Sequence, residues 1–458
     1  MDFGILSTIL DPVINAGPLF MIFIVFTVIG LIVKLGVLRA IRNGLMIAVG
    51  FQGVYIVVDF FLGSVAPAAE ELALRFGGVF TYTDIGWSAF ASFAFASPWA
   101  YAVIGLSLLV NLVMIFTKMT DTLNLNIWDF WEAIIATLMV QLLTDNIVAG
   151  LVFGTFLAWF NLMMSDFNAQ RGYCADLGFE GLSFYQGTNV AWGAFGHYVG
   201  QLLDKTGLEA KFTPEYIQEK FGVIGEPAVL GGLIGLLMGL GAGFYWTDII
   251  LLMIALATSL VLIPMMSGIV MQALVPVSEA AGSFMKKSAG GQQLYIGVDP
   301  AIAVGNTTVL ATTVLMVPIL LLLAFIIPGT VNHPLADLPS LLFFWVFVVA
   351  PNKFDMLRTL ITTTLMGIYG TFAATIGVAK WSSMVAVASG VEVAEGTGVT
   401  AWFNHLCPEM LVAGLLGENF NNIGGMTGLI AFCLVVVAIT IVFRLRYLKR
   451  MKTEAAAA

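Results

Sequence analysis

The sequence predicts an all-α polytopic membrane protein, with about eleven transmembrane helices. Of its 458 residues, 59% are hydrophobic and only 10% are charged, whereas soluble domains carry about 25% charged residues. Apolar runs near the ~20-residue length that crosses a bilayer recur along the chain. They cover residues 17–33, 44–65, 99–117, 227–245, 249–275, 308–327 and 424–443. Because these runs are continuous rather than alternating, they favour helices over a transmembrane barrel.

The placement of Lys and Arg predicts the orientation of the chain in the membrane. Residues 1–33 contain neither, whereas Lys34, Arg39 and Arg42 follow the first apolar run and a basic tail closes the chain. We therefore expect the N-terminus outside and the C-terminus in the cytoplasm, which requires an odd number of spans. The start lacks the basic region of a cleaved signal peptide, so the first span should remain in the protein.

Two segments of the chain share a layout that predicts an internal repeat. Each begins with two apolar helices, of which the second ends in a Pro-x-x-Glu step at Pro67 or Pro276, and a short amphipathic stretch follows. An aspartate, Asp84 or Asp299, then precedes a small-residue helix and a long apolar run. Five spans per half would insert the second copy from the opposite side, the inverted-repeat layout of many transporters. The alternative is chance similarity among apolar segments.

These features divide the chain into four parts. Residues 1–165 hold the first transmembrane repeat, and 227–380 hold the second, inverted one. Between them, 166–226 is a polar connector with amphipathic helices, one of which we place at 213–221. Residues 381–458 contain a re-entrant or amphipathic segment, the last transmembrane helix and the basic cytoplasmic tail.

Asp299 is the first candidate for a functional residue, because it lies just before a long apolar run. Pro300 has no N–H and disfavours helix at Asp299, so we expect the chain to break there. A carboxylate at membrane depth is costly and therefore needs a partner or a function. Non-helical backbone at that depth is tolerated only where protein buries it or where it lines a water-filled cavity. Asp299 either accepts a substrate hydroxyl or caps the helix that follows, and the two roles are compatible.

Three further acidic residues are candidates. Glu226 precedes Pro227 at the start of the sixth span, where it is either functional or a loop carboxylate before an ordinary helix start. Asp129 and Glu132 are three residues apart and share one helix face. That pair is either part of the site or an interfacial pair that reaches toward water.

An aromatic side chain beside a carboxylate suits a sugar or polyol, because C–H groups pack on the ring and hydroxyls bond to the acid. Asp84 and Trp87 have this arrangement, although tryptophan is also common at membrane interfaces. Amide and hydroxyl side chains extend the candidate set, since amides both donate and accept hydrogen bonds. They are Gln186, Thr188, Asn189, Asn306 and Thr307. An ordinary turn or helix–helix contacts are the competing interpretations.

The sequence offers no metal or cofactor motif. Its three histidines and three cysteines are scattered without ligand spacing, and no phosphate-binding loop or nucleophile motif is present. We therefore expect no metal, no cofactor and no nucleic-acid partner.

Several segments resemble the galactitol-type membrane subunit, enzyme IIC, of the bacterial phosphoenolpyruvate-dependent phosphotransferase system. They are residues 221–227, 296–301, 305–307, 84–87 and 126–131. The resemblance extends over nearly the whole chain. It implies the ascorbate–galactitol superfamily, whose members are inner-membrane homodimers with eleven spans, broken or re-entrant helices and two inverted five-helix repeats.

The resemblance also implies partners and chemistry. A IIB protein carries a phosphocysteine, an upstream IIA protein carries a phosphohistidine, and the substrate is phosphorylated on a hydroxyl as it is translocated. In the related ascorbate subunit, an aspartate that matches Asp299 lies at the sugar, and polar residues near the Gln186 region line that site. Galactitol subunits carry His where this chain has Gln186, Asn306 and Glu132. Galactitol, another hexitol, a pentitol or a ketose therefore remain open as substrates.

The predicted mechanism uses Asp299 and Glu226 as catalytic carboxylates, one of which accepts the proton of the phosphorylated hydroxyl. The substrate-binding set is Asp84, Trp87, Gln186, Thr188, Asn189, Asn306, Thr307 and Glu132. The alternative is an ion-coupled secondary transporter of a sugar or polyol, without phosphorylation, in which the two catalytic acids carry protons.

Overall fold

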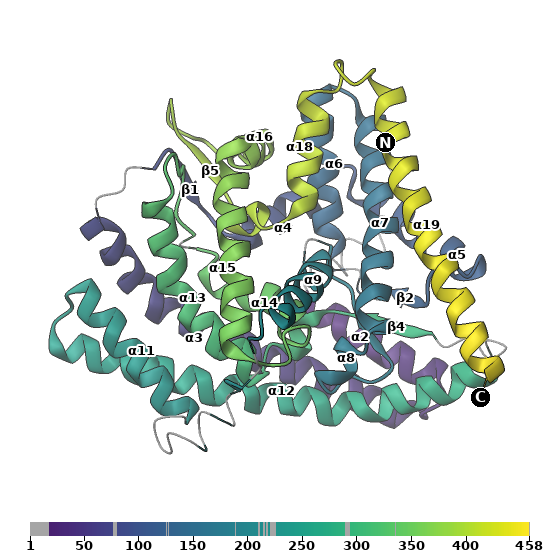
Figure 1. The fold of residues 1–458 in the computed structure, drawn as a ribbon, viewed down its shortest axis with the longest axis horizontal. Coiled ribbons are helices and arrows are strands. Elements are labelled where there is room, and N and C mark those ends of the chain that lie inside the picture. The colour runs from purple at the N-terminus through teal and green to yellow at the C-terminus, as the bar shows by residue number, and fades with distance from the viewer. Residues whose placement is uncertain are drawn as a thin grey trace.

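A computed structural model describes most of the chain. The described residues are 18–76, 80–124, 126, 128–187, 189–208, 211–213, 216, 219, 226–288, 294–334 and 336–457. Helices dominate the architecture, and the strands are short (Figure 1).

The elements follow one another in four groups. The first contains α2 (Pro18–Ile32), α3 (Val37–Phe76), β1 (Tyr82–Asp84), α4 (Trp87–Ala96), α5 (Ala100–Phe116), β2 (Thr122–Asn124), α6 (Phe130–Thr144) and α7 (Ile147–Gln170). The second contains α8 (Tyr173–Asp176), β3 (Leu182–Phe184) and α9 (Ala191–Lys205). The third contains α11 (Pro227–Ala242), α12 (Trp246–Ser288), β4 (Tyr295–Val298), the 3-10 turn η2 (Pro300–Ala303), α13 (Thr307–Ile326), η3 (Leu338–Leu341), α14 (Leu342–Val349) and α15 (Met356–Ala373). The fourth contains the π-helical segment η4 (Ala374–Val378), α16 (Ala379–Ala388), β5 (Gly398–Thr400), α17 (Trp402–His405), α18 (Pro408–Glu418) and α19 (Met426–Ala457).

The helical, polytopic class is confirmed. Each predicted apolar run falls in a helix: α2, α3, α5, α11, α12, α13 or α19. Within the described residues, five helices are long and apolar enough to cross a membrane, and a sixth span results if the bent pair α4–α5 counts as one. That pair turns by 94°, as a broken span or re-entrant loop does. The count of about eleven, the inverted repeat and the homodimer remain predictions.

Two very long helices cross the remaining bundle. α3 has 40 residues and α12 has 43, so each is about 60 Å long, roughly twice the ~30 Å hydrocarbon core. In Figure 1, α12 runs along the lower edge, whereas α6, α7, α13, α15 and α19 stand across it. α2 and α11 pack on these long helices. We call α2, α3, α11 and α12 the scaffold, and α4–α9 with α13–α19 the core.

One local prediction about the scaffold is wrong. We expected the second helix of each half to end at Pro67 or Pro276, but α3 continues through Pro67 to Phe76 and α12 continues through Pro276. A proline removes one helical hydrogen bond and kinks a helix, yet in an apolar setting the helix remains the best way to pair the other backbone groups.

Close helix contacts in the scaffold depend on glycine. A Cβ atom on Gly235 of α11 would lie 2.7 Å from the Met253 Cα of α12. A Cβ atom on Gly50 of α3 would lie 2.5 Å from the Val270 Cγ2 of α12. Small residues at such positions let membrane helices approach closely, which explains part of the high glycine content.

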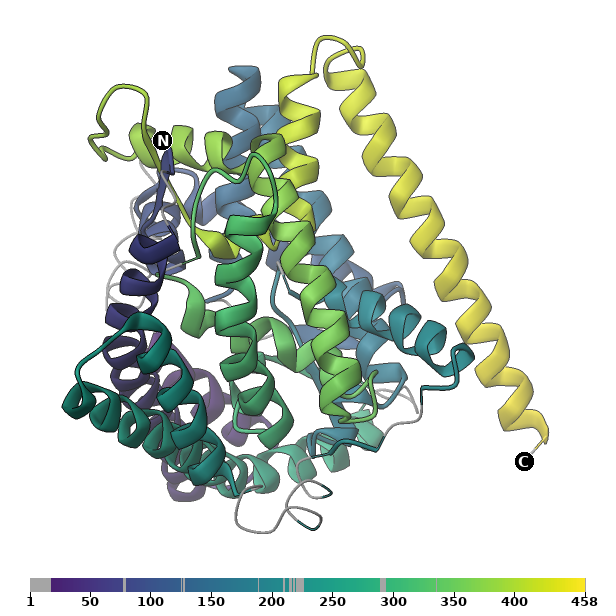
Figure 2. The same cartoon turned by 60° about the vertical axis from the view of Figure 1, so that its left-hand side comes forward.

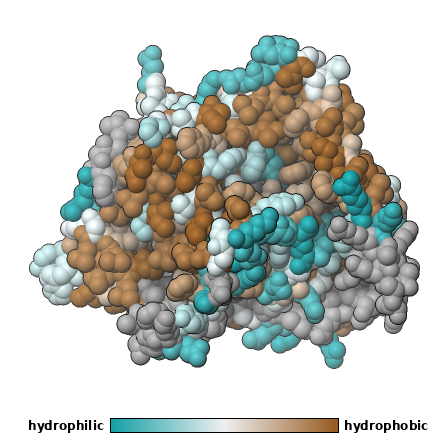
Figure 3. Space-filling model, viewed as in Figure 1, coloured by the Kyte–Doolittle hydropathy of each residue, from teal (hydrophilic) through white to brown (hydrophobic). Residues whose placement is uncertain are grey.

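The surface has the apolar character of a protein surrounded by lipid. Hydrophobic residues cover much of the face in Figure 3, and polar residues lie at its upper and lower margins and in a patch below and to the right of its centre. α19 runs along the outside of the molecule (Figure 2), and only 17% of its most apolar window is buried. Large apolar side chains such as Leu434 and Phe443 are exposed on this helix, as expected where a helix faces lipid.

Two small parallel sheets, which the sequence analysis did not predict, hold the segments before the candidate aspartates. In one sheet β1 pairs with β5, and in the other β4 lies between β2 and β3. The first N–H of β1 and the first N–H of β4 each donate to the other half of the chain. Tyr82 N donates to Val331 O at 3.0 Å, and Tyr295 N donates to Asp121 O at 2.6 Å. The ends of β1 and β4 are therefore fixed by segments far away in the sequence.

Candidate functional site

Asp299 follows the central strand of the three-stranded sheet. β4 ends at Val298, and Asp299 is extended, with φ −66° and ψ 130°, before Pro300 begins the turn η2. The predicted break is confirmed, and so is the capping role, because Ala301 N donates to Asp299 Oδ1 at 2.7 Å. Within the described residues no hydrogen bond reaches Oδ2. The half-buried carboxylate therefore keeps one oxygen available for a ligand.

A second aspartate, Asp129, lies close enough to Asp299 for the two carboxylates to interact electrostatically. It follows β2, the neighbour of β4, and is buried. Asn126 Nδ2 donates both to Asp129 Oδ2 and, at 3.0 Å, to Tyr185 O. Asn126 thus joins the segment after β2 to the segment after β3. The sequence analysis paired Asp129 with Glu132 but did not place it in the substrate-binding set.

The third strand brings the predicted amide residues to the same place. Tyr185 N donates to Val298 O at 3.0 Å, directly before Asp299. Gln186 follows, buried, and its Oε1 accepts from Asn189 Nδ2 at 2.6 Å. Gln186 and Asn189 form the turn that leads into α9, and this turn is itself part of the candidate site.

Glu132 reaches this turn from α6. It is 1% exposed, and a Cβ atom on Gly187 would collide with its Oε2. Glycine at position 187 is therefore what lets the carboxylate lie against the backbone of the turn. The Glu132 and Asp129 carboxylates also act electrostatically on Tyr185.

The carboxyl ends of β2, β4 and β3 thus converge, and Asp129, Asp299 and Gln186 follow these ends with Glu132 beside them. In open sheets of parallel strands, ligands bind outside the carboxyl ends. We call Asp129, Glu132, Gln186, Asn189 and Asp299 the strand-end cluster.

Asn306 and Thr307 begin the helix that follows Asp299. Asn306 is the N-cap of α13, since its Oδ1 accepts from Thr308 N at 3.0 Å and from Val309 N at 3.4 Å. Within the described residues, the Asn306 amide nitrogen has no hydrogen-bond partner. The cap fixes Asn306 and leaves its donor group free, while Thr307 is the first helical residue.

Asp84, the last residue of β1, has a different environment from Asp299, which directly follows β4. Asp84 Oδ1 accepts from Trp402 N at 3.1 Å, and its Oδ2 accepts from Asp337 N at 3.0 Å. Asp337 Oδ1 in turn accepts from Trp87 N at 2.8 Å, and its Oδ2 accepts from Phe403 N at 2.7 Å. All four carboxylate oxygens therefore bind backbone N–H groups. The Asp84–Asp337 pair anchors the starts of α4 and α17. By contrast, Asp129 and Asp299 form an open pair, in which each carboxylate has one oxygen without a hydrogen bond among the described residues.

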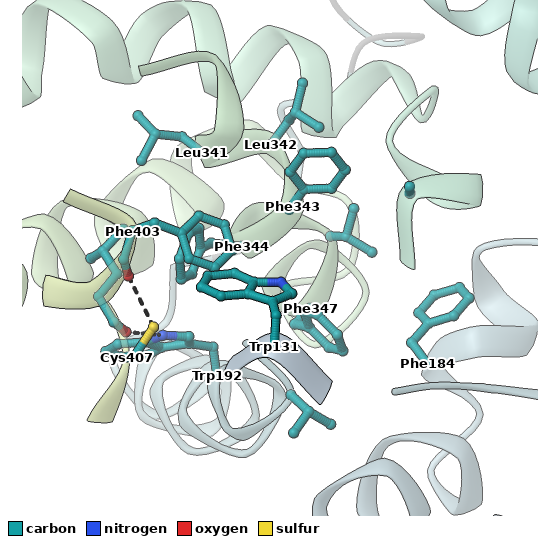
Figure 4. Close-up of a cluster of buried hydrophobic side chains, with 14 of the residues drawn as sticks. Trp131, Phe184, Trp192, Leu341, Leu342, Phe343, Phe344, Phe347, Phe403 and Cys407 are labelled. Carbon is teal, nitrogen blue, oxygen red and sulfur yellow. Dashed lines mark hydrogen bonds between the residues drawn. The ribbon is translucent and has the colours of Figure 1, made fainter. Parts of the chain in front are cut away.

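Trp87 lies in a buried aromatic cluster next to Glu132. Its ring centroid is 6.0 Å from that of Trp131 and 6.1 Å from that of Phe403. Phe344 completes this group from α14, 4.5 Å from Phe403 (Figure 4). Because Trp131 precedes Glu132 on α6, the cluster fixes the helix that carries this carboxylate.

Glu226 is not joined to the strand-end cluster. Its side chain is exposed at the start of α11, where Pro227 begins the helix as predicted. No hydrogen bond or ion pair connects it to Asp299 in the part of the chain that the structure describes. Thr188, and most of the predicted helix 213–221, lie outside the described residues.

Among the described residues, His, Cys, Asp and Glu form no group of three that could hold a metal ion. A buried ion pair fixes the amino-terminal ends of β2 and β4, opposite the strand-end cluster. Arg444 of α19 binds Asp121 with both terminal nitrogens, at 2.5 and 2.6 Å. Asp121 O is the acceptor for Tyr295 N, so the last helix holds the beginning of β4 in place.

Ion pairs also tie α9, in the connector, to Lys353 and to the first turn of α15. Asp204 Oδ1 accepts from Lys353 Nζ at 2.7 Å and from Arg358 Nη1 at 2.8 Å. These hydrogen bonds lower the pKa of the Asp204 carboxyl. Arg358 Nη2 also donates to Gly200 O at 2.8 Å, which fixes the end of α9.

Known proteins are similar in sequence to this chain over most of its length. The family model EIIC-GAT, the PTS system sugar-specific permease component, matches residues 12–395. The chain is 32% identical over 362 residues to the putative permease IIC component of Escherichia coli (strain K12), which covers 78% of this chain and 82% of that protein. It is 29% identical over 396 residues to the PTS system galactitol-specific EIIC component of the same strain, with 83% and 87% coverage. The galactitol-specific EIIC component of Escherichia coli O157:H7 matches to the same extent.

Proposed function

We propose a specific function from the premise that this chain belongs to the EIIC-GAT family of sugar-specific permease components of the phosphotransferase system. The protein translocates a galactitol-like sugar alcohol across the bacterial inner membrane, and a phosphocysteine IIB partner phosphorylates it. The observation that carries the proposal is the open carboxylate pair of Asp129 and Asp299 at the strand ends, beside Glu132 and Gln186.

The chemistry of the strand-end cluster favours a neutral polyhydroxyl substrate. Carboxylates accept hydrogen bonds from hydroxyls, and the amides both donate and accept. Phosphate or carboxylate substrates need Arg or Lys instead. Among the described residues, no ion pair joins a cation to Asp129 or Asp299. The galactitol-specific name of one relative agrees with this chemistry.

The transfer step follows from the open oxygen of Asp299. Substrate enters from outside, binds between a moving core and the scaffold, and donates a hydroxyl hydrogen bond to Oδ2. After the site reaches the cytoplasmic side, the substrate oxygen forms a bond to phosphorus while the S–P bond of IIB breaks. IIB retains the thiolate, and Asp299 accepts the hydroxyl proton, as positioned carboxylates do in kinases. The charged ester then has no favourable outward path.

Three further sequence predictions enter this proposal. In it, Asn306 and Thr307 contact the substrate from the start of α13. Asp84 and Trp87 act by fixing the wall of the site, since Asp84 is occupied by backbone groups. Glu226 becomes a second acid only if core movement carries substrate to the start of α11, and a Glu226→Gln variant with full turnover would remove it from the mechanism.

We extend the proposal to an inverted repeat in a homodimer, with the N-terminus outside. Strand pairing supports the repeat. β1 is flanked by Val331 of the second half and by β5, while β4 is flanked by β2 of the first half and by β3. The spacing between Asn124 and Asp129 also recurs between Asn332 and Asp337. In both halves, the second aspartate then lies near the aspartate at the end of a strand from the other half, Asp129 near Asp299 and Asp337 near Asp84.

Inverted membrane vesicles that contain the protein test the function directly. With phosphorylated IIB they should convert an acyclic polyol to its phosphate ester, and vesicles without IIB should not. A panel of polyols with four to six carbons identifies the substrate. Uptake that requires a proton gradient and proceeds without phosphorylated IIB would support the alternative, ion-coupled secondary transport.

A further inference from the structure

Glu409 is a buried acid that the proposed mechanism does not use. It is the second residue of α18 and is 5% exposed. Among the described residues, neither carboxyl oxygen has a hydrogen-bond partner in another residue, and none of the ion pairs there includes Glu409. An isolated buried carboxyl group is costly, whether charged or neutral. Such a group therefore indicates an occupant that the chain itself does not supply.

Other unpaired polar groups lie around Glu409. The Tyr369 hydroxyl of α15 interacts electrostatically with Glu409, and this hydroxyl also lacks a hydrogen-bond partner within the part of the chain that the structure describes. The indole N–H of Trp402 is buried and unpaired as well. Its ring lies against Gly370, the residue after Tyr369, with Cζ2 only 3.3 Å from the position of a Cβ atom. One acceptor and two donor groups therefore lack partners in one part of the core.

The carboxyl group of Glu409 and the two unpaired donor groups together favour a neutral hydroxyl group as the ligand. A cation would pair with Glu409 but leave the Trp402 and Tyr369 donors unused, and an anion would be repelled by Glu409 and by the nearby Glu132. A hydroxyl donates one hydrogen bond and accepts two, so its donor and acceptor capacity matches these three groups. The Trp192 ring, 5.3 Å from that of Tyr369, adds an aromatic surface for C–H groups.

The position of Glu409 continues the strand-end cluster. Asp299 interacts with Asp129, Asp129 with Glu132, and Glu132 with Glu409. These carboxylates form a series that leads from β4 through α6 to α18. Hydroxyls on successive carbons of an extended, acyclic polyol match such a series, whereas a compact substrate bound at Asp299 does not extend to its far end.

We propose that Glu409, Tyr369 and Trp402 form a second hydroxyl-binding subsite, which takes the end of the polyol remote from the phosphorylated hydroxyl. This inference rests on the proposed function, since the same substrate occupies both ends of the series. The subsite selects substrates by their length. It contributes equally to binding of the ground state and of the transition state.

The kinetics of IIB-dependent phosphorylation test the subsite, with the polyol that wild-type vesicles phosphorylate fastest as the probe. Glu409→Gln removes a charge-assisted hydrogen bond, so KM should rise about tenfold while kcat changes less than about twofold. Tyr369→Phe deletes only the hydroxyl, and KM should rise about threefold or more. Glu395→Gln, at an exposed loop position, is the matched control and should leave both constants unchanged.

The outcomes separate this inference from the proposed function. If Asp299→Asn is inactive but Glu409→Gln and Tyr369→Phe keep the wild-type KM, the subsite holds water only and the inference is overturned while the function stands. If wild-type vesicles phosphorylate no polyol, the function itself fails. Should Glu409→Gln not reach the membrane, the Tyr369→Phe variant decides alone, and an unchanged KM rejects the subsite.

Discussion

Asp337 gives the sharpest test of how the core is held together. Its two oxygens accept backbone N–H groups of Trp87 and Phe403, at 2.8 and 2.7 Å, and its side chain is 1% exposed. Hydrogen bonds to a charged group contribute about 1.5–3 kcal/mol each. Asp337→Ala should therefore cost about 3–6 kcal/mol. Asp337→Asn keeps one acceptor but turns an NH2 group toward the other N–H, so it should cost about half as much.

Thermal unfolding of the purified, detergent-solubilised protein measures this order. The wild type should have the highest midpoint, Asp337→Asn an intermediate one and Asp337→Ala the lowest. Asp248→Asn, at an exposed position in the first turn of α12, is the control and should match the wild type. The opposite expectation comes from the neighbouring Asp84 carboxylate, because like charges repel. An Asp337→Asn protein more stable than the wild type would show that repulsion outweighs the backbone hydrogen bonds, which would refute the reasoning.

Three further predictions concern the surroundings of the cluster. Arg444→Met leaves Asp121 buried without its cation, so it should lower stability by about 3–5 kcal/mol; the double variant with Asp121→Leu should recover much of the loss in the same unfolding assay. Gly187→Ala places a methyl group against the buried Glu132 Oε2, so KM for the polyol should rise, and the unfolding midpoint should fall with the ~1–3 kcal/mol cost of overpacking. Asp204→Asn tests how stability depends on pH. Lys353 and Arg358 lower the pKa of the Asp204 carboxyl in the folded protein. The stabilising effect of this carboxylate is therefore present above its unfolded pKa of about 3.9 and is lost as pH falls through the lower folded value. Because Asp204 is largely exposed, the effect should be under about 1 kcal/mol, and the difference between variant and wild type should shrink below pH ~4.

Sequence patterns were sufficient for the helices but not for the strands. Apolar runs such as 308–327 correspond closely to α13, because a bilayer-length apolar segment has no better way to pair its backbone. The five described strands are three or four residues long and pair with segments far away in the chain. Nothing local encodes that pairing. The sequence therefore predicted a break at Asp299 without the sheet that positions it.

The same limit applies to the candidate site. Asp84 and Asp299 look alike in sequence, and only the distant donors Trp402 and Asp337 distinguish an occupied carboxylate from an open one. Asp129 was visible as a carboxylate near Glu132, and the Asn-to-Asp spacing shared with the Asp337 region was a signal for its role. Glu409 gave no local signal, because its importance comes from the absence of partners in the folded core.

The central claim is that the open carboxylate of Asp299 receives the substrate hydroxyl. IIB-dependent phosphorylation of the polyol by vesicles that contain Asp299→Asn tests it most directly, with Asp248→Asn as the matched control. The account predicts that Asp299→Asn reaches the membrane with normal stability and loses phosphorylation by at least about a hundredfold, while Asp248→Asn remains fully active. Wild-type turnover in the Asp299→Asn vesicles would contradict it.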